Sequence, residues 1–182
     1  MVQVDLTLQV QPHTASATDE AGETAMAGLS EAQWQTYFEQ WIDALNPQQS
    51  KIGAYEVSLL LTTDAEIQAL NATYRHQDRA TDVLAFASLE WEGPHNSALD
   101  DLPTPLGDIA ISVETAARQA AENGHDLSQE LLWLASHGLL HLLGWDHPDP
   151  SSLDLMLTEQ ARLIRKIGFL PPSWSAEELG YF

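Results

Sequence analysis

Residues 137–147, HGLLHLLGWDH, contain three of the chain's seven histidines. His137 and His141 are four residues apart, so on a helix their side chains would project from the same face. Gly144 can adopt the left-handed conformation that ends a helix and turns the chain back, bringing His147 towards the other two. The spacing therefore predicts one metal site with three imidazole ligands, His137, His141 and His147.

Three protein ligands leave one coordination position open, which is typical of a catalytic rather than a structural zinc site. A metal in such a site can lower the pKa of a bound water to about 7. The chain has no cysteine, and nitrogen ligands without sulfur favour one zinc ion per chain, with nickel, copper and iron as alternatives. A single buried histidine is usually a packed, hydrogen-bonded side chain, but three at this spacing are better explained by a metal.

The same spacing, H-x-x-x-H-x-x-G-x-x-H, occurs in metzincin proteases, where the second residue is a glutamate that acts as general base. Gly138 stands at that position here. Peptide hydrolysis needs a base beside the metal, and this motif supplies none. A zinc peptidase is therefore disfavoured and stays an alternative only if another residue supplies the base.

A phosphodiester makes different demands, because its developing charge lies on phosphoryl oxygens that a metal and an arginine can stabilise. The stretch 71–86, NATYRHQDRATDVLAF, carries Arg75 and Arg79, two of only seven basic residues in the chain. A surface ion pair is the ordinary role of a lone arginine. In so acidic a chain, however, these two residues are also candidates for holding a phosphate.

These stretches together resemble a known family. The first block is N-x-x-Y-R with T-D-V-L-A-F, the second is L-G-D-I-A-I-S, and the third is HGLLHLLGWDH. These blocks and their order resemble the YbeY family of bacterial and organellar endoribonucleases, the rRNA maturation factors. The resemblance covers about residues 50–170. It implies a zinc-dependent, single-strand-specific endoribonuclease that acts in small-subunit ribosomal RNA maturation and ribosome quality control. It also implies that the three histidines ligate zinc and that Arg75 is the arginine associated with activity.

Four residues within these motifs have other expected roles. By position in the family's strand motifs, Asp82 is expected in a turn or cap, and Asp108 in a strand-edge hydrogen bond near the site. Asp146 could orient a ligand imidazole or hydrogen-bond within its own turn. Trp145 could stack on a base, although packing at a helix end is the more common role of such a residue.

The rest of the chain predicts the elements that position these motifs. Strands are expected at 2–10, 55–63, 82–88 and 106–113, and helices at 30–45, 64–75, 114–124, about 126–143 and after Pro150. The helix at about 126–143 is apolar nearly all round and is predicted to be the central buried helix, which carries the histidines. The pattern predicts one α+β domain, residues 1–182, with a mixed sheet of about four strands packed with helices. Residues 11–28 are expected to form a flexible connection.

The charge balance is strongly acidic, with 27 acidic and 7 basic residues and a formal net charge of -20. This works against non-specific nucleic-acid binding, so an RNA substrate requires positive charge concentrated at the site. No apolar run approaches the roughly 20 residues of a membrane span, and no secretory signal is visible. With the resemblance, we expect a cytoplasmic protein that takes single-stranded RNA or rRNA, with the ribosome or ribosomal proteins as partners, and neither DNA nor membrane.

A non-catalytic alternative also stays open. In a zinc-stabilised ribosome-assembly factor, the metal would only tie the helix end to His147. Such a metal would have a complete protein shell, for which Asp146 is the candidate fourth ligand. The general base of the predicted nuclease is not assigned by the sequence.

Overall fold

The structure is a computed structural model of the chain and describes residues 2–11, 25–88 and 101–172. Its strands are β1 (Gln3–Val10), β2 (Ala25–Met26), β3 (Leu29–Ser30), β4 (Ala54–Thr62), β5 (Val83–Ala87) and β6 (Thr104–Ser112). Its helices are α1 (Glu31–Leu45), α2 (Asp64–Arg75), α3 (Val113–Asn123), α4 (Leu127–Leu142) and α5 (Pro150–Lys166). The four predicted strands and the five predicted helices are all confirmed, with ends close to those expected.

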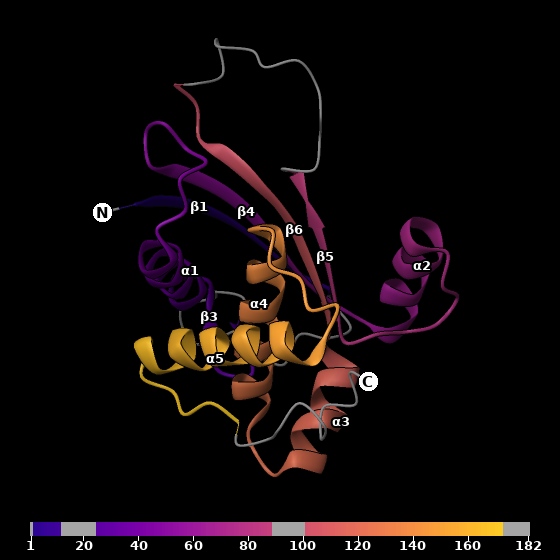
Figure 1. Ribbon diagram of the computed structural model, residues 1–182. Helices are drawn as coiled ribbons and strands as arrows, with labels where there is room; N and C mark the ends of the chain where they lie inside the picture. The colour runs from indigo at the N-terminus through magenta and orange to yellow at the C-terminus, as the bar shows by residue number, and fades with distance from the viewer. Residues whose placement is uncertain (1, 12–24, 89–100, 173–182) are drawn as a thin grey trace.

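The main sheet is four-stranded and has the order β1-β4-β6-β5 (Figure 1). β4 pairs in parallel with β1 and β6, whereas β5 pairs antiparallel with β6. The predicted α+β class with a mixed sheet is therefore confirmed. Because β5 is the last strand in this order, one of its edges has no neighbour in the sheet.

Helix α4 is the centre of the core. It packs on β5 and β6 on one side and on α5 and α3 on others, and Figure 1 shows it between the sheet and α5. Its buried leucines include Leu131, Leu132, Leu139, Leu140 and Leu142. The helix is buried nearly all round, as its sequence predicts, so the residues it carries into the site have a fixed backbone.

The opposite face of the sheet is only partly covered. Helix α2 packs there, and Ile67 of α2 forms a small buried cluster with Leu84 of β5 and Ala110 of β6. Beyond α2, this face of the sheet is hollowed into a groove. The two faces therefore differ, because α1 and α4 pack against one, whereas among the described helices only α2 covers part of the other.

The predicted connection at 11–28 is only partly visible, because residues 12–24 lie outside the described residues. Ala25–Met26 pair antiparallel with Leu29–Ser30 as β2 and β3, a short ladder that the sequence did not predict. Much of the loop between β5 and β6, residues 89–100, also lies outside the described residues. A single domain over 1–182 with a flexible segment stays a prediction. Within the described ranges, no helix combines the length and hydropathy of a membrane span.

Candidate metal centre

The end of α4 and the turn after it bring the three histidines together. His137 and His141 lie one helical turn apart on α4. Gly144 has φ +86° and its N–H donates to the His141 carbonyl at 3.0 Å, while the Trp145 N–H donates to the Leu140 carbonyl at 3.0 Å. These bonds close the helix end and turn the chain back. The turn returns His147 to the face that carries the other two imidazoles.

The three imidazoles converge on one point. Nε2 of His141 lies 3.1 Å from Nε2 of His137, and the His147 ring centroid lies 5.5 Å from that of His137 and 5.3 Å from that of His141. One candidate ligand atom from each residue lies within 4.8 Å of the others. A tetrahedral zinc site has nitrogen pairs about 3.4 Å apart, given Zn–N distances of about 2.0–2.1 Å. The three-histidine group can therefore bind a metal ion; which metal it binds stays a prediction.

His137 is held by a residue of another helix. Its Nδ1 lies 3.0 Å from Oε1 of Gln160 on α5, and Nε2 of Gln160 donates to the Trp133 carbonyl at 3.3 Å. Since the amide nitrogen faces a carbonyl, the amide oxygen must accept, and the proton of the imidazole is on Nδ1. Nε2 of His137 then presents its lone pair towards His141, as a metal ligand must.

Gln160 is a residue of the site that the sequence alone did not reveal. The residue is fully buried on α5, where its neighbours in the inward stripe, Met156 and Leu163, are apolar. A polar amide in such a stripe needs a hydrogen-bonding partner. That break in the apolar pattern was the signal available, although the identity of the partner required the tertiary structure.

Burial favours the neutral form of His137 and His141. Burial, followed by the charge of His141, lowers the pKa of His137 to about 4, against the opposing effect of the Gln160 hydrogen bond. Burial also lowers the pKa of His141, as does the charge of His147, whereas a hydrogen bond with the Trp145 backbone acts to raise it. Neutral imidazole is the form that binds a metal, so these residues fit the ion that the spacing predicts.

The histidines open into a cavity of about 270 Å³. Arg75, the last residue of α2, lines the same cavity, and its Nη2 donates to the Ala85 carbonyl of β5 at 3.3 Å. The structure thus brings Arg75 to the three histidines from a helix on the other face of the sheet. Arg79, by contrast, is exposed, is not part of the cavity lining, and donates to the Gln77 side chain.

Asp82 has the structural role expected of it, although it also lines the cavity. Its Oδ1 accepts from the Val83 N–H at 2.8 Å and from the Thr81 hydroxyl at 3.2 Å, and its Oδ2 accepts from Nε2 of Gln119 at 3.1 Å. Its own carbonyl accepts from the Ser112 N–H at 2.8 Å. The carboxylate therefore fixes the start of β5 beside the histidines and ties it to α3.

Asp108 was expected to make a strand-edge hydrogen bond near the histidines, and this prediction is wrong. Alternation along β6 puts Ile109 on the face that meets α4 and Asp108 on the opposite face, where its exposed side chain lines the groove. Of the two roles considered for Asp146, the structure shows the hydrogen bond within its own turn, because its Oδ1 accepts the His147 N–H at 2.8 Å. Trp145 is 36% exposed and lines a shallow depression beside the turn, so it is not a packed core residue.

The close packing of α4 on β6 explains the glycine at position 138, which the sequence alone did not. A Cβ built at this position would lie 2.8 Å from Cγ2 of Ile109 and 3.2 Å from its Cγ1. Glycine therefore lets α4 approach β6 closely, directly beneath the histidines. A glutamate there would meet the Ile109 side chain, so the general base of a metzincin could be placed at 138 only if that side chain shifted.

An α+β domain whose central helix and following turn present three converging histidines beside an arginine defines a candidate metalloenzyme. Residues 20–168 match the family described as endoribonuclease YbeY. A protein of that name from Acaryochloris marina is 60% identical over 131 residues, which cover 72% of this chain and 74% of that protein. Another, from Trichormus variabilis, is 46% identical over 171 residues, covering 92% of this chain and 96% of that protein. The chain belongs to the endoribonuclease YbeY family, which confirms the resemblance and the prediction of an enzyme.

Among solved structures, the solution structure of TM1509 from Thermotoga maritima matches with a TM-score of 0.49 and 22% sequence identity, covering 92% of this chain and 89% of that one.

Proposed function

We propose that this protein is a zinc-dependent endoribonuclease that cuts single-stranded RNA in the cytoplasm, acting in small-subunit rRNA maturation and ribosome quality control. Ribosomal RNA is then its substrate and the ribosome or ribosomal proteins its partners. The observation that carries the proposal is the meeting of Arg75 with His137, His141 and His147 around one cavity. The activity named for the curated relatives supports the reaction class.

In this proposal the three histidines hold one zinc ion. When bound, zinc would polarise a phosphoryl oxygen and lower the pKa of a water. Gln160 keeps His137 in the tautomer that offers Nε2. The guanidinium of Arg75 is held to β5 through Nη2, and its other N–H groups have no acceptor among the described residues, so they can donate to a phosphate. Arg75 thus orients the scissile phosphate beside the histidines.

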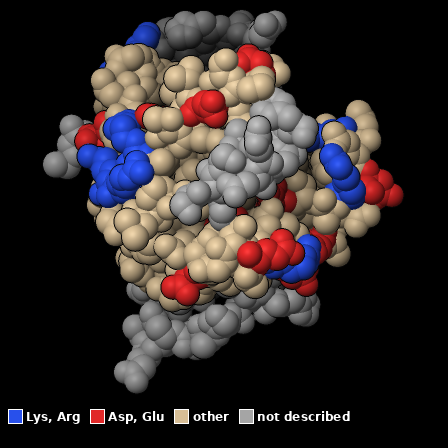
Figure 2. Space-filling model, turned by 60° about the horizontal axis from the view of Figure 1, so that its bottom comes forward, with Lys and Arg blue, Asp and Glu red and all other residues tan. Residues whose placement is uncertain are grey.

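The charge distribution favours a short RNA contact. On the face shown in Figure 2, basic side chains stand in separate groups with acidic ones among them, and they form no continuous basic surface over the described residues seen there. A protein that binds long duplexes instead presents a broad basic face, because each phosphate contact releases counterions. One arginine at one cavity suits a single strand bound locally.

A purely structural metal is less well supported. Among the described residues, the group that could hold a metal consists of the three histidines, without a fourth protein ligand. The candidate fourth ligand, Asp146, uses Oδ1 to hold its own turn. An open coordination position is the mark of a catalytic site.

The test is cleavage of a labelled single-stranded RNA by the full chain. We expect cleavage by the zinc-loaded protein, loss after chelation, and recovery when zinc is restored. The His137→Ala variant should be inactive and should also lose the rise in unfolding temperature that zinc gives the wild type, since a ligand bound only by the folded state stabilises it. RNA cleavage that survives in chelated protein and in His137→Ala would overturn the proposal, as would cleavage of casein without cleavage of RNA.

A further inference from the structure

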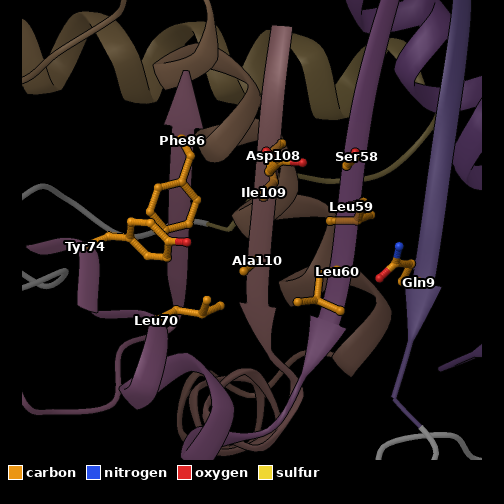
Figure 3. A pocket seen from close by; sticks show the side chains of 10 residues that line it. All are labelled: Gln9, Ser58, Leu59, Leu60, Leu70, Tyr74, Phe86, Asp108, Ile109 and Ala110. Carbon is orange, nitrogen blue, oxygen red and sulfur yellow. The ribbon is translucent and has the colours of Figure 1, made fainter. Parts of the chain in front are cut away.

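A groove of about 340 Å³ lies on the face of the sheet opposite the histidines (Figure 3). Its floor is a row of cross-strand neighbours, in which Asp108 of β6 pairs with Ser58 of β4 on one side and with Phe86 of β5 on the other. The small side chain of Ala110 continues the floor, and Tyr74 of α2 stands at the rim. The volume lies at the lower end of the range of about 300–1,000 Å³ for ligand pockets.

The rim of the groove is aromatic and open to solvent. Tyr74 is 64% exposed, and its ring lies 5.2 Å from the Phe86 ring, centroid to centroid, with 63° between the planes. Figure 3 shows both rings on the same side of the groove. Single-stranded RNA is recognised largely by stacking its unpaired bases on such rings. A flat, apolar, π-faced ligand is the chemistry that this rim fits.

The floor of the groove adds one charged group. Asp108 is exposed in the middle of an interior strand, a position where aspartate is unfavourable. None of the hydrogen bonds or ion pairs between described residues uses its carboxylate. A carboxylate only accepts hydrogen bonds, so it repels a phosphate and selects a ligand edge that carries N–H donors. Charge therefore favours a base in this groove over the RNA backbone.

Guanine matches this carboxylate best. Its Watson–Crick edge carries adjacent donors, N1–H and the N2 amino group, which can pair with both oxygens of one carboxylate. Adenine and cytosine offer one amino group beside an acceptor on that edge, and uracil offers one N–H between two carbonyls. Each of these places an acceptor against Asp108, so only guanine satisfies both oxygens without repulsion.

The groove and the histidine cavity are lined by residues that are neighbours in the sequence on α2 and on β5. Tyr74 directly precedes Arg75, and Phe86 directly follows Ala85, whose carbonyl accepts from Arg75. Ala85 lines the histidine cavity, whereas Phe86 lines the groove. Because β5 is the last strand of the sheet, the groove and the histidine cavity lie on the two sides of one sheet edge.

We propose that this groove is a nucleobase subsite that prefers guanine and holds the base beside the phosphate contacted by Arg75. Tyr74 and Phe86 supply the stacking surface and Asp108 reads the base edge. The identification of the ligand as RNA rests on the proposed function, whereas the preference for guanine rests on the groove itself.

The experiment measures binding separately from cutting. In the His137→Ala protein, which is expected not to cut, fluorescence anisotropy compares a uridine oligoribonucleotide carrying one guanosine with the same oligoribonucleotide carrying inosine, which lacks only the N2 amino group. We expect the inosine change to weaken binding about tenfold. Adding Asp108→Asn should abolish this difference, whereas Glu56→Gln, which neutralises an exposed carboxylate two residues before Ser58 on β4, should keep it. Adding Tyr74→Ala should weaken both oligoribonucleotides about tenfold, and Tyr74→Phe should not.

Equal binding of the guanosine and inosine oligoribonucleotides would overturn the proposed subsite. This comparison needs no variant of a groove residue, so it does not depend on whether such a variant folds. A difference that persists in Asp108→Asn would overturn the assignment of Asp108, and would leave the groove to a protein partner or other ligand. Cleavage by the protein with His137 intact is the second arm. Guanosine-selective binding without any cleavage would support the guanine subsite and contradict the proposed nuclease activity. Cleavage without guanosine selectivity would support the nuclease activity and contradict the guanine subsite.

Discussion

Nδ1 of His137 lies 3.0 Å from Oε1 of Gln160, so a side chain of α5 sets the orientation of an imidazole on α4. The two residues are far apart in sequence, and both are buried. Hydrogen bonds of this kind fix the tautomer of a metal-binding histidine and increase its basicity. The candidate metal centre therefore includes a residue that is not one of the predicted ligands.

Replacing Gln160 tests this relationship. Gln160→Met nearly keeps the side-chain volume but removes the acceptor, and we expect zinc affinity to fall about 10–100-fold. Competition with a chromogenic chelator measures the change. Met156→Leu, a change at a buried neighbour on the same helix, is the control for packing and should leave affinity nearly unchanged. Equal losses in the two variants would show that packing, not the hydrogen bond, is responsible.

Arg75→Ala should remove most of the RNA cleavage without removing zinc. Loss of a donor that stabilises developing charge costs about 10²–10³-fold in kcat, which a single-turnover cleavage assay can measure. Arg79→Ala is the matched control, because Arg79 is an exposed cation four residues further along that does not line the cavity. A comparable loss in both variants would indicate a general effect of positive charge.

Gly138→Ala should destabilise the protein, although alanine is normally the better residue in a helix by about 1 kcal/mol. The added Cβ would meet Cγ2 of Ile109 at 2.8 Å, and overpacking of this kind costs about 1–3 kcal/mol. Urea denaturation gives the free energy of unfolding. In an Ile109→Ala background the same substitution should cost less, since the clashing atoms are gone. An undiminished cost there would point to another cause.

Asp64 should make stability depend on acid pH. Burial alone raises the pKa of its carboxyl, but hydrogen bonds from Ser112, Thr115 and Arg118, with the charge of Arg118, outweigh it and lower the pKa below 3.8. A lowered folded-state pKa contributes stability that is complete above about 3.8 and disappears as pH falls through the folded value. The difference in unfolding free energy between wild type and Asp64→Asn should therefore shrink on acidification. A difference that is constant from neutral pH to pH 2 contradicts this.

Local patterns were enough to predict that the three histidines lie together. The four-residue spacing of His137 and His141 on an apolar helix, with Gly144 after it, determines where the imidazoles point, because these effects act within two turns of chain. The mixed sheet and the buried helix followed from periodicity in the same way. Arg75 was recognised through its motif, but its position beside the histidines depends on how α2 crosses the edge of β5.

The sequence does not show which residues of a buried strand point towards the histidines and which point to the opposite face of the sheet. The strand around Asp108 is apolar on both sides, with Ile109 and Ala110 both buried, so its sequence does not show which neighbour faces α4. Gln160 likewise required the packing of α5 on α4. The reason for Gly138 lies in one contact between a helix and a strand, and only tertiary structure reveals such a contact.

That contact also bears on how this enzyme family can change. The histidine spacing is shared with proteases, and a single codon change could place glutamate at 138, yet the Ile109 side chain occupies the space that its first carbon would need. A glutamate at 138 would therefore carry a packing cost before it could serve as a base. Close packing beneath the histidines thus penalises the first step from one chemistry towards the other.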